Sequence, residues 1–459
     1  MDRNCISFSI DEVLKWEQEG VPRKWDPFWN VKSVFTAGGM DGGGSPIKSP
    51  LSLPESVVLR VMPMGCPRHS DFGKLLDPVV SDRMWTFWLR ENDIVTGRYI
   101  NEVGKAIEEL LERSNPKPKV IFIVQTCIDL LLGTDYTGII KRLEERYHIR
   151  IGISQMEPMV NGKLAQDEGF FKKAMYGCLR GEYSKEKENA VNIVGRETVP
   201  SEEGDLVQLL KSAGVQKINY WQKYKTMEEA DEMCYAKLNI AMEFTSLPTV
   251  KMMEKKWGIP YVYLKNSYLP DKIHENYQKL GEALGVTIDD SVYYDSIIKK
   301  IEDVRKMCVD NTFVIGENVD ARASKGASEL MKLGFDVRAF FSKIILKEDY
   351  EYIKEIYKIN PEVKIYSSSH PSVYYYMKQP EEFDYAVGLV QELYEHNKNT
   401  IGIKAPERFS EYRALERILK QIEESKQEKK ETKMSSNIEN ESYKQFKNWG
   451  MFRSHEEFK

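Results

Sequence analysis

A short apolar run, VIFIV at residues 120–124, ends in the polar residues Gln125, Thr126 and Cys127. A continuous run of this length, rich in β-branched residues and closed by polar ones, is typical of a strand buried on both faces of a parallel sheet. The next segment, 137–147, has apolar residues at helical spacing. A buried strand followed by an amphipathic helix is the repeating unit of an α/β fold.

The same alternation recurs along the chain. It predicts further strands at 57–61, 191–195, 260–264, 312–316, 336–341 and 363–366, and further helices at 224–240, 271–284 and 320–333. The pattern restarts near 186 and near 309. We therefore predict a fold of class α/β with three Rossmann-like parallel-sheet domains, at 1–185, 186–308 and 309–423. Residues 424–459 are expected to form a charged linker and an aromatic C-terminal tail.

Composition excludes several classes of partner. The chain has 459 residues, with 66 Lys and Arg against 71 Asp and Glu, a net charge of −5. No global positive field is present, so nucleic acid is not expected as a partner. No apolar stretch approaches the roughly 20 residues of a membrane helix, and the N-terminus lacks the pattern of a secretory signal, so we predict a cytoplasmic protein without membrane contact. The six cysteines contain no CxxC pair and are expected to be free thiols or ligands.

Common catalytic motifs are missing from the sequence. There is no GxxxxGK[ST], no GxGxxG after a predicted strand, no HExxH and no GxSxG. The glycine-rich segment 38–44 neither follows a predicted strand nor opens a helix. The chain itself therefore shows no ATP site.

Two cysteines stand where ligands bind in α/β proteins. Cys66 comes just after the run 57–61, and Cys127 comes just after the run 120–124. Carboxyl ends of parallel strands meet at one edge of the sheet, so we expect the two thiols to converge there. Thiolates at such an edge suit iron. The spacing alone favours another explanation, two small buried packing residues, because free cysteine is among the most buried residue types.

A family resemblance adds to this interpretation. The segment Thr126-Cys127-Ile128-Asp129 with Gly133-Thr134-Asp135 resembles the region of the third cluster cysteine in nitrogenase component 1 subunits. Further similar segments are Ser45-Pro46-Ile47-Lys48, Met64-Gly65-Cys66, Ala236-Lys237-Leu238-Asn239-Ile240 and Met253-Glu254-Lys255-Lys256-Trp257-Gly258-Ile259-Pro260-Tyr261. Together they span most of residues 30–420 in the family's order. The resemblance implies three α/β domains around a central cavity and an iron–sulfur cluster bound by Cys66 and Cys127.

The sequence departs from the family at its other ligand positions. The region of the first cluster cysteine has none, and Asp41 is either an oxygen ligand, as in the similar dark-operative protochlorophyllide reductase, or a solvated loop residue. The resemblance puts the cofactor cysteine at about Met242-Glu243-Phe244 and the cofactor histidine in the stretch 399–408, and neither residue type is present there. We therefore expect no molybdenum or vanadium cofactor. Glu243, if buried, is a candidate proton donor, and His370 is either a second one or an ordinary loop residue.

The resemblance also implies a function. The chain is expected to be a subunit of a nitrogenase-like reductase, in a heterodimer or larger oligomer with a homologous component 1 subunit that shares its iron–sulfur cluster. Electrons would come from a separate ATP-dependent iron–sulfur reductase protein, and the substrate would be a small molecule or a tetrapyrrole. Two alternatives stay open: a scaffold on which a metallocofactor is assembled, and a metal-free α/β protein that binds a small ligand.

Overall fold

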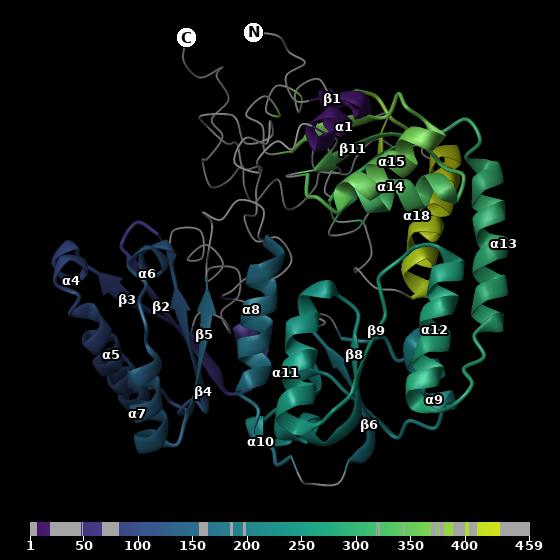
Figure 1. Cartoon of the computed structure of the whole chain (residues 1–459). Coiled ribbons are helices and arrows are strands. Elements are labelled where there is room, and N and C mark those ends of the chain that lie inside the picture. The colour runs from purple at the N-terminus through teal and green to yellow at the C-terminus, as the bar shows by residue number, and fades with distance from the viewer. Residues whose placement is uncertain are drawn as a thin grey trace, which may run out of the picture.

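The computed structural model describes residues 7–18, 47, 49–66, 82–155, 164–183, 187–195, 199–317, 319, 322–342, 345–368, 373, 376, 381–388, 400–403 and 411–431. Figure 1 shows that these residues form three sheets with helices packed around them. The α/β class predicted from the alternation of strands and helices is confirmed. No described helix is both long and apolar enough to cross a membrane.

The first sheet is entirely parallel and has the strand order β3-β2-β4-β5. Its strands are β2 (Ser56–Pro63), β3 (Met84–Leu89), β4 (Val120–Gln125) and β5 (Arg150–Gln155). Along β4, Ile121 and Ile123 face a core shared with helices α5 and α7. The alternate residues, among them Phe122, face a second core shared with α8 and the second sheet. Because both faces are covered, the strand is apolar from Val120 to Val124.

The second sheet is also parallel, with the order β7-β6-β8-β9. It contains β6 (Glu188–Val194), β7 (Lys217–Asn219), β8 (Ala236–Ala241) and β9 (Tyr261–Tyr263). The prediction of a helix over 224–240 is wrong for the second half of that range. A short helix and a 3-10 turn end at Tyr235, and residues 236–241 are strand β8. There the apolar residues Ala236, Leu238 and Ile240 alternate with polar ones, and pairing with β6 and β9 favours the extended form.

The third sheet has six strands in the order β1-β12-β11-β10-β13-β14. The parallel strands are β10 (Thr312–Ile315), β11 (Asp336–Ser342), β12 (Lys364–Ser367), β13 (Tyr385–Val387) and β14 (Ile401–Ile403). The N-terminal strand β1 (Ser7–Ser9) pairs antiparallel with β12. Residues near the N-terminus thus complete a sheet made by the last third of the chain.

Helices fill the layers between the sheets. In Figure 1, α8 lies between the first sheet and α11, while α13 and α18 lie beside each other near the third sheet. Helix α18 extends to Glu431, into the segment expected as a charged linker from 424. The helices other than 3-10 turns are α1 (Ile10–Gln18), α4 (Glu91–Thr96), α5 (Tyr99–Arg113), α6 (Cys127–Leu132), α7 (Thr137–Tyr147), α8 (Leu164–Gly177), α9 (Asp205–Ser212), α10 (Met227–Ala230), α11 (Leu247–Trp257), α12 (Pro270–Leu284), α13 (Ser291–Met307), α14 (Ala323–Lys332), α15 (Asp349–Ile359) and α18 (Tyr412–Glu431).

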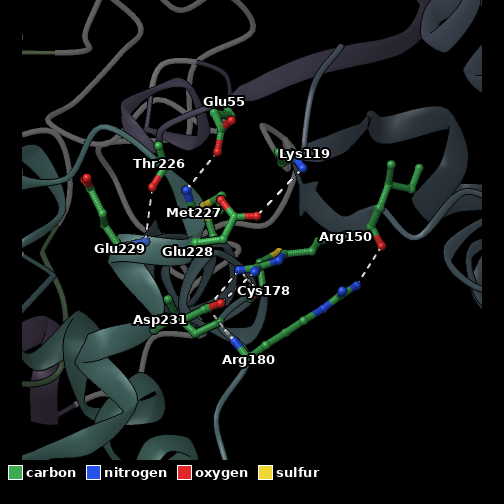
Figure 2. A network of polar contacts seen from close by, with 12 residues as sticks. Glu55, Lys119, Arg150, Cys178, Arg180, Thr226, Met227, Glu228, Glu229 and Asp231 are labelled. Atoms are coloured by element: carbon green, nitrogen blue, oxygen red, sulfur yellow. Dashed lines mark hydrogen bonds and ion pairs between the residues drawn. The ribbon is translucent and has the colours of Figure 1, made fainter.

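A polar network links the amino-terminal end of the first sheet to α10 and the 3-10 turn that precede β8 of the second sheet (Figure 2). The guanidinium of Arg150, the first residue of β5, donates two hydrogen bonds to the carboxylate of Asp231, at 2.8 and 2.6 Å. Asp231 also accepts from the backbone N–H of Arg180 at 2.7 Å. Nearby, Glu55 accepts from the N–H of Met227 at 2.9 Å. The network thus adds polar contacts to the apolar core that the two sheets share.

Candidate functional site

The two candidate cluster cysteines follow neighbouring strands of the first sheet. The chain enters this sheet at β2, adds β3 on one side and then places β4 on the other. The crevice at such a reversal, outside the carboxyl ends of the strands, is where ligands bind in open α/β sheets. Cys66 lies three residues beyond β2, is exposed, and donates its N–H to the carbonyl of Pro63 at 3.0 Å. Cys127 is the first residue of α6, directly after β4.

Two of the predicted site residues, a candidate ligand and a candidate proton donor, are not described. Asp41 and His370 lie outside the described residues, and the backbone alone is placed at Cys127. Convergence of the Cys66 and Cys127 thiols therefore stays a prediction. Within the described ranges, no group of three or more His, Cys, Asp or Glu side chains could hold a metal ion. Two thiols are fewer ligands than a four-cysteine cluster needs.

Exposed apolar side chains gather at the same edge of the first sheet. They come from the segments that follow β2, β3 and β4: Met64 is 78% exposed, Val95 84%, Leu131 75% and Leu132 51%. Figure 1 places α4 and α6, which carry three of these residues, at one end of the sheet. Large apolar side chains exposed in a group mark a protein interaction site more often than those scattered singly. The edge that carries Cys66 therefore has the character of an interface.

Glu243 occupies the equivalent position in the second sheet. That sheet also reverses its order, between β6 and β8, and Glu243 follows β8 while Gly195 follows β6. Its carboxylate forms an ion pair with the ammonium of Lys172 on α8. Lys172 also donates to the hydroxyl of Thr245 at 3.1 Å, and that hydroxyl donates to Glu243 at 3.1 Å. The three side chains form a closed polar cluster.

The residues around this cluster come from α8, from the end of β6 and from the segment before α14. The guanidinium of Arg322, just before α14, lies 5.6 Å from the ring centre of Phe244. The hydroxyl of Tyr176 accepts from the N–H of Gly195 at 2.9 Å. Burial, and to a smaller extent the charge of Glu243, raises the pKa of Tyr176 well above its ordinary value. This phenol is therefore neutral at physiological pH.

Two features of this cluster were not foreseen. Glu243 was expected as a proton donor on condition of burial, yet its side chain is 23% exposed and faces an ammonium. Lys172, only 5% exposed, was not predicted at all. A signal was available, because Lys172 precedes the buried Tyr176 by four residues and helical spacing puts both on one face of α8. A lysine on the buried face of a helix needs a partner.

A glycine substitution tests how closely the residue after β6 approaches the turn before α11. Gly195 has φ of +81°, and a Cβ there would lie 2.0 Å from Oγ of Ser246. We expect Gly195→Ala to lower the free energy of unfolding by about 2–4 kcal/mol, from backbone strain and overpacking together. Gly214→Ala is the matched control, since Gly214 has φ of +79° and open space around it. Urea denaturation of both variants checks this, and equal losses would contradict the close approach.

Comparison with known proteins places the chain in a family. Residues 62–435 match the family described as nitrogenase component 1 type oxidoreductase. This match covers most of the chain, so the protein belongs to that family. The resemblance predicted from the sequence motifs is thereby confirmed, in a divergent member. The family is of oxidoreductase type, and its proteins bind iron–sulfur clusters and work in multi-subunit complexes with an ATP-dependent reductase.

Two curated relatives are nitrogenase iron-molybdenum cofactor biosynthesis proteins NifE. That of Clostridium pasteurianum is 27% identical over 278 residues, which cover 58% of this chain and 59% of that protein. That of Sinorhizobium fredii (strain NBRC 101917 / NGR234) is 22% identical over 323 residues, covering 67% and 63%. The chain thus spans less than two thirds of the length of either relative.

Two solved structures share the fold. Nitrogenase Cp1 at pH 6.5 superposes with a TM-score of 0.65 at 13% identity, covering 92% of this chain and all of that one. Nitrogenase Cp1 at pH 5 superposes with a TM-score of 0.54 at 14% identity, covering 86% and 90%. At these identities the likeness shows the fold alone.

Proposed function

We propose that this chain is a subunit of a nitrogenase-like complex and holds an iron–sulfur cluster jointly with a homologous partner chain. The observation that carries the proposal is the exposed Cys66, at an edge where Met64, Leu131 and Leu132 are also exposed. An exposed thiol at an edge that also exposes apolar side chains suits an iron ligand that a partner subunit covers.

In this proposal Cys66 and Cys127 are the ligands from this chain. Thiolate sulfur suits the iron of such clusters, and burial at a subunit interface excludes water and tunes the reduction potential. Asp41 is a candidate oxygen ligand. The partner subunit would supply the remaining ligands, which makes the protein an obligate oligomer.

The cluster of Lys172, Glu243 and Thr245 is proposed as part of the second functional region. It lies where the family resemblance puts a cofactor cysteine, and it offers a carboxylate already paired with an ammonium. Such a pair lacks the thiolate or imidazole that anchors a soft metal–sulfide cofactor. We therefore propose that this region takes no molybdenum or vanadium cofactor and binds an organic substrate or a differently anchored cluster. We also propose Glu243, which is partly rather than fully buried, and His370 as candidate proton donors.

Two tasks are consistent with such a subunit. As a reductase, the complex would pass electrons from an ATP-dependent iron–sulfur protein to a small or tetrapyrrole substrate, in line with the oxidoreductase family. As a scaffold, it would hold a metallocofactor during assembly. The second task is favoured by the two relatives, both cofactor biosynthesis proteins, and by the missing cofactor thiolate.

One experiment tests the shared cluster. We expect the chain, co-expressed anaerobically with its homologous partner, to purify as a brown hetero-oligomer with iron and labile sulfide and without molybdenum or vanadium in proportion to protein. Metal analysis and sedimentation velocity are the measurements. A monomer that carries its full iron would contradict the proposal. Stoichiometric molybdenum or vanadium, lost in Glu243→Ala, would contradict the cofactor assignment.

The two tasks are separated by turnover. A reductase reduces substrate repeatedly when the cognate reductase protein, ATP and a reductant are supplied. A scaffold instead transfers its metal cargo to an acceptor protein and loses iron in proportion. A colourless, iron-free protein that binds a small molecule would favour the metal-free alternative.

A further inference from the structure

Helix α6, which begins at Cys127, is too short to be stable by its own hydrogen bonds. It has six residues, Cys127–Leu132, whereas isolated helices in water need about 12–15 residues. Gly133 follows it with φ of +62°, and the N–H of Thr134 donates to the carbonyl of Asp129 at 2.8 Å. This is the Schellman arrangement that closes a helix at its C-terminal end. Asp129 therefore anchors the end of α6 through its main chain.

The side chain of Asp129 anchors the other end. Oδ2 accepts from the backbone N–H of Thr126, the residue before α6, at 3.0 Å. Oδ1 accepts from the hydroxyl of Tyr136, just before α7, at 2.8 Å. Asp129 is 1% exposed and Tyr136 is fully buried. One residue thus ties together the start of α6, the end of α6 and the start of α7.

A second contact braces the same loop. The hydroxyls of Tyr99, the first residue of α5, and Thr134 are hydrogen-bonded to each other. The side chain of Gln125, at the end of β4, donates to the carbonyl of Thr134 at 3.3 Å. The loop from β4 to α7 is therefore held from the strand before it and from two helices.

The energetic cost of this arrangement points to a role beyond packing. Among the described residues, the groups that donate hydrogen bonds to the carboxylate of Asp129 are neutral, and no cation pairs with it. A buried carboxylate without a cation is costly even when it is hydrogen-bonded. A leucine would avoid that cost but would leave the N–H of Thr126 and the hydroxyl of Tyr136 without their acceptor. What the carboxylate adds is a fixed position for the turn that carries Cys127.

We propose that Asp129 is the positioning residue of Cys127, holding the first turn of α6 at the edge of the sheet where the cluster is bound. The inference rests on the proposed function for the role of Cys127 as a ligand. The placement of the turn by Asp129 does not depend on the cluster being there. The two claims can therefore fail separately.

The test uses the full-length chain freed of metal by chelation, with the alkylation rates of Cys127 and Cys66 measured by mass spectrometry. We expect Asp129→Asn, which keeps the shape and removes the charge, to raise the rate at Cys127 by roughly tenfold and to leave Cys66 unchanged. Tyr136→Phe, which removes one hydrogen bond, should raise it less. The matched control is Asp135→Asn, in the same loop, whose carboxylate accepts from the N–H of Thr137 at 2.8 Å instead.

A purely structural role is excluded by a second readout on the assembled complex. In Asp129→Asn we expect a changed EPR signal of the reduced cluster, and in Asp135→Asn the wild-type signal. Unchanged alkylation of Cys127 in both Asp129→Asn and Tyr136→Phe would overturn the inference. Full iron content in a complex carrying Cys127→Ala would instead overturn the proposed function, while an effect of Asp129 on the Cys127 rate would still stand.

Discussion

Changing Asp231 to alanine is expected to lower the free energy of unfolding by about 3–5 kcal/mol, the cost of leaving a buried charge without its partner. The charge is that of Arg150, which is 7% exposed. Asp231 receives both arms of this guanidinium at 2.8 and 2.6 Å and the N–H of Arg180 at 2.7 Å. Urea denaturation followed by tryptophan fluorescence measures the loss.

The control for this variant lies in the same network (Figure 2). Glu228 pairs with Lys119 at 3.8 Å, and the two side chains are 63% and 53% exposed. Glu228→Ala should therefore cost less than about 1 kcal/mol. Asp231 precedes β8 of the second sheet and binds Arg150 of the first sheet. We therefore also expect its loss to disturb the relative position of the two sheets. Equal effects of the two variants would show that burial does not decide the strength of this junction.

Changing Cys66 or Cys127 to alanine is expected to remove the iron–sulfur cluster from the assembled complex. Iron per complex should fall more than about tenfold. Losing even a residue that hydrogen-bonds to a metal ligand lowers metal affinity about 10–100-fold, and here the ligand itself is lost. Iron and sulfide analysis and the visible spectrum of anaerobically prepared protein are the measurements.

Cys308→Ala is the control for the cysteine variants. Cys308 follows α13, is 5% exposed and has a side-chain contact with Tyr385, so its replacement changes only contacts inside the protein. Burial raises the pKa of its thiol, which disfavours the thiolate that iron requires. Unchanged iron content in Cys66→Ala would show that this exposed thiol is no ligand.

The two candidate sites differ in how far the sequence could predict them. Cys66 and Cys127 were placed beside their strands because buried parallel strands are continuous apolar runs and end at polar residues. The partners of Glu243 were not predictable in this way. Lys172 is 71 positions away in the chain, and the pair forms because α8 packs against the second sheet. The spacing of residues along a helix predicts which face is buried, but it does not predict which side chains that face contacts.

Local pattern also failed where two structures compete for the same residues. Over 224–240 the apolar residues are consistent with a helix, and strand pairing with β6 and β9 made residues 236–241 extended instead. The third sheet shows the same limit, because β1 joins β12 from the other end of the chain. Strand partners are set by hydrogen bonds between segments that are far apart in the chain. A pattern within a short stretch of sequence therefore cannot predict them.

The sequence by itself determined the α/β class, the family and the cysteines that follow the two central strands of the first sheet, since these depend on apolar runs, polar strand ends and ordered motifs. The tertiary structure alone decided that Cys66 and nearby apolar side chains are exposed, that Lys172 pairs with Glu243, and that Asp129 is buried and accepts from the N–H of Thr126. The physical reason is that exposure and pairing belong to surfaces made by several elements together.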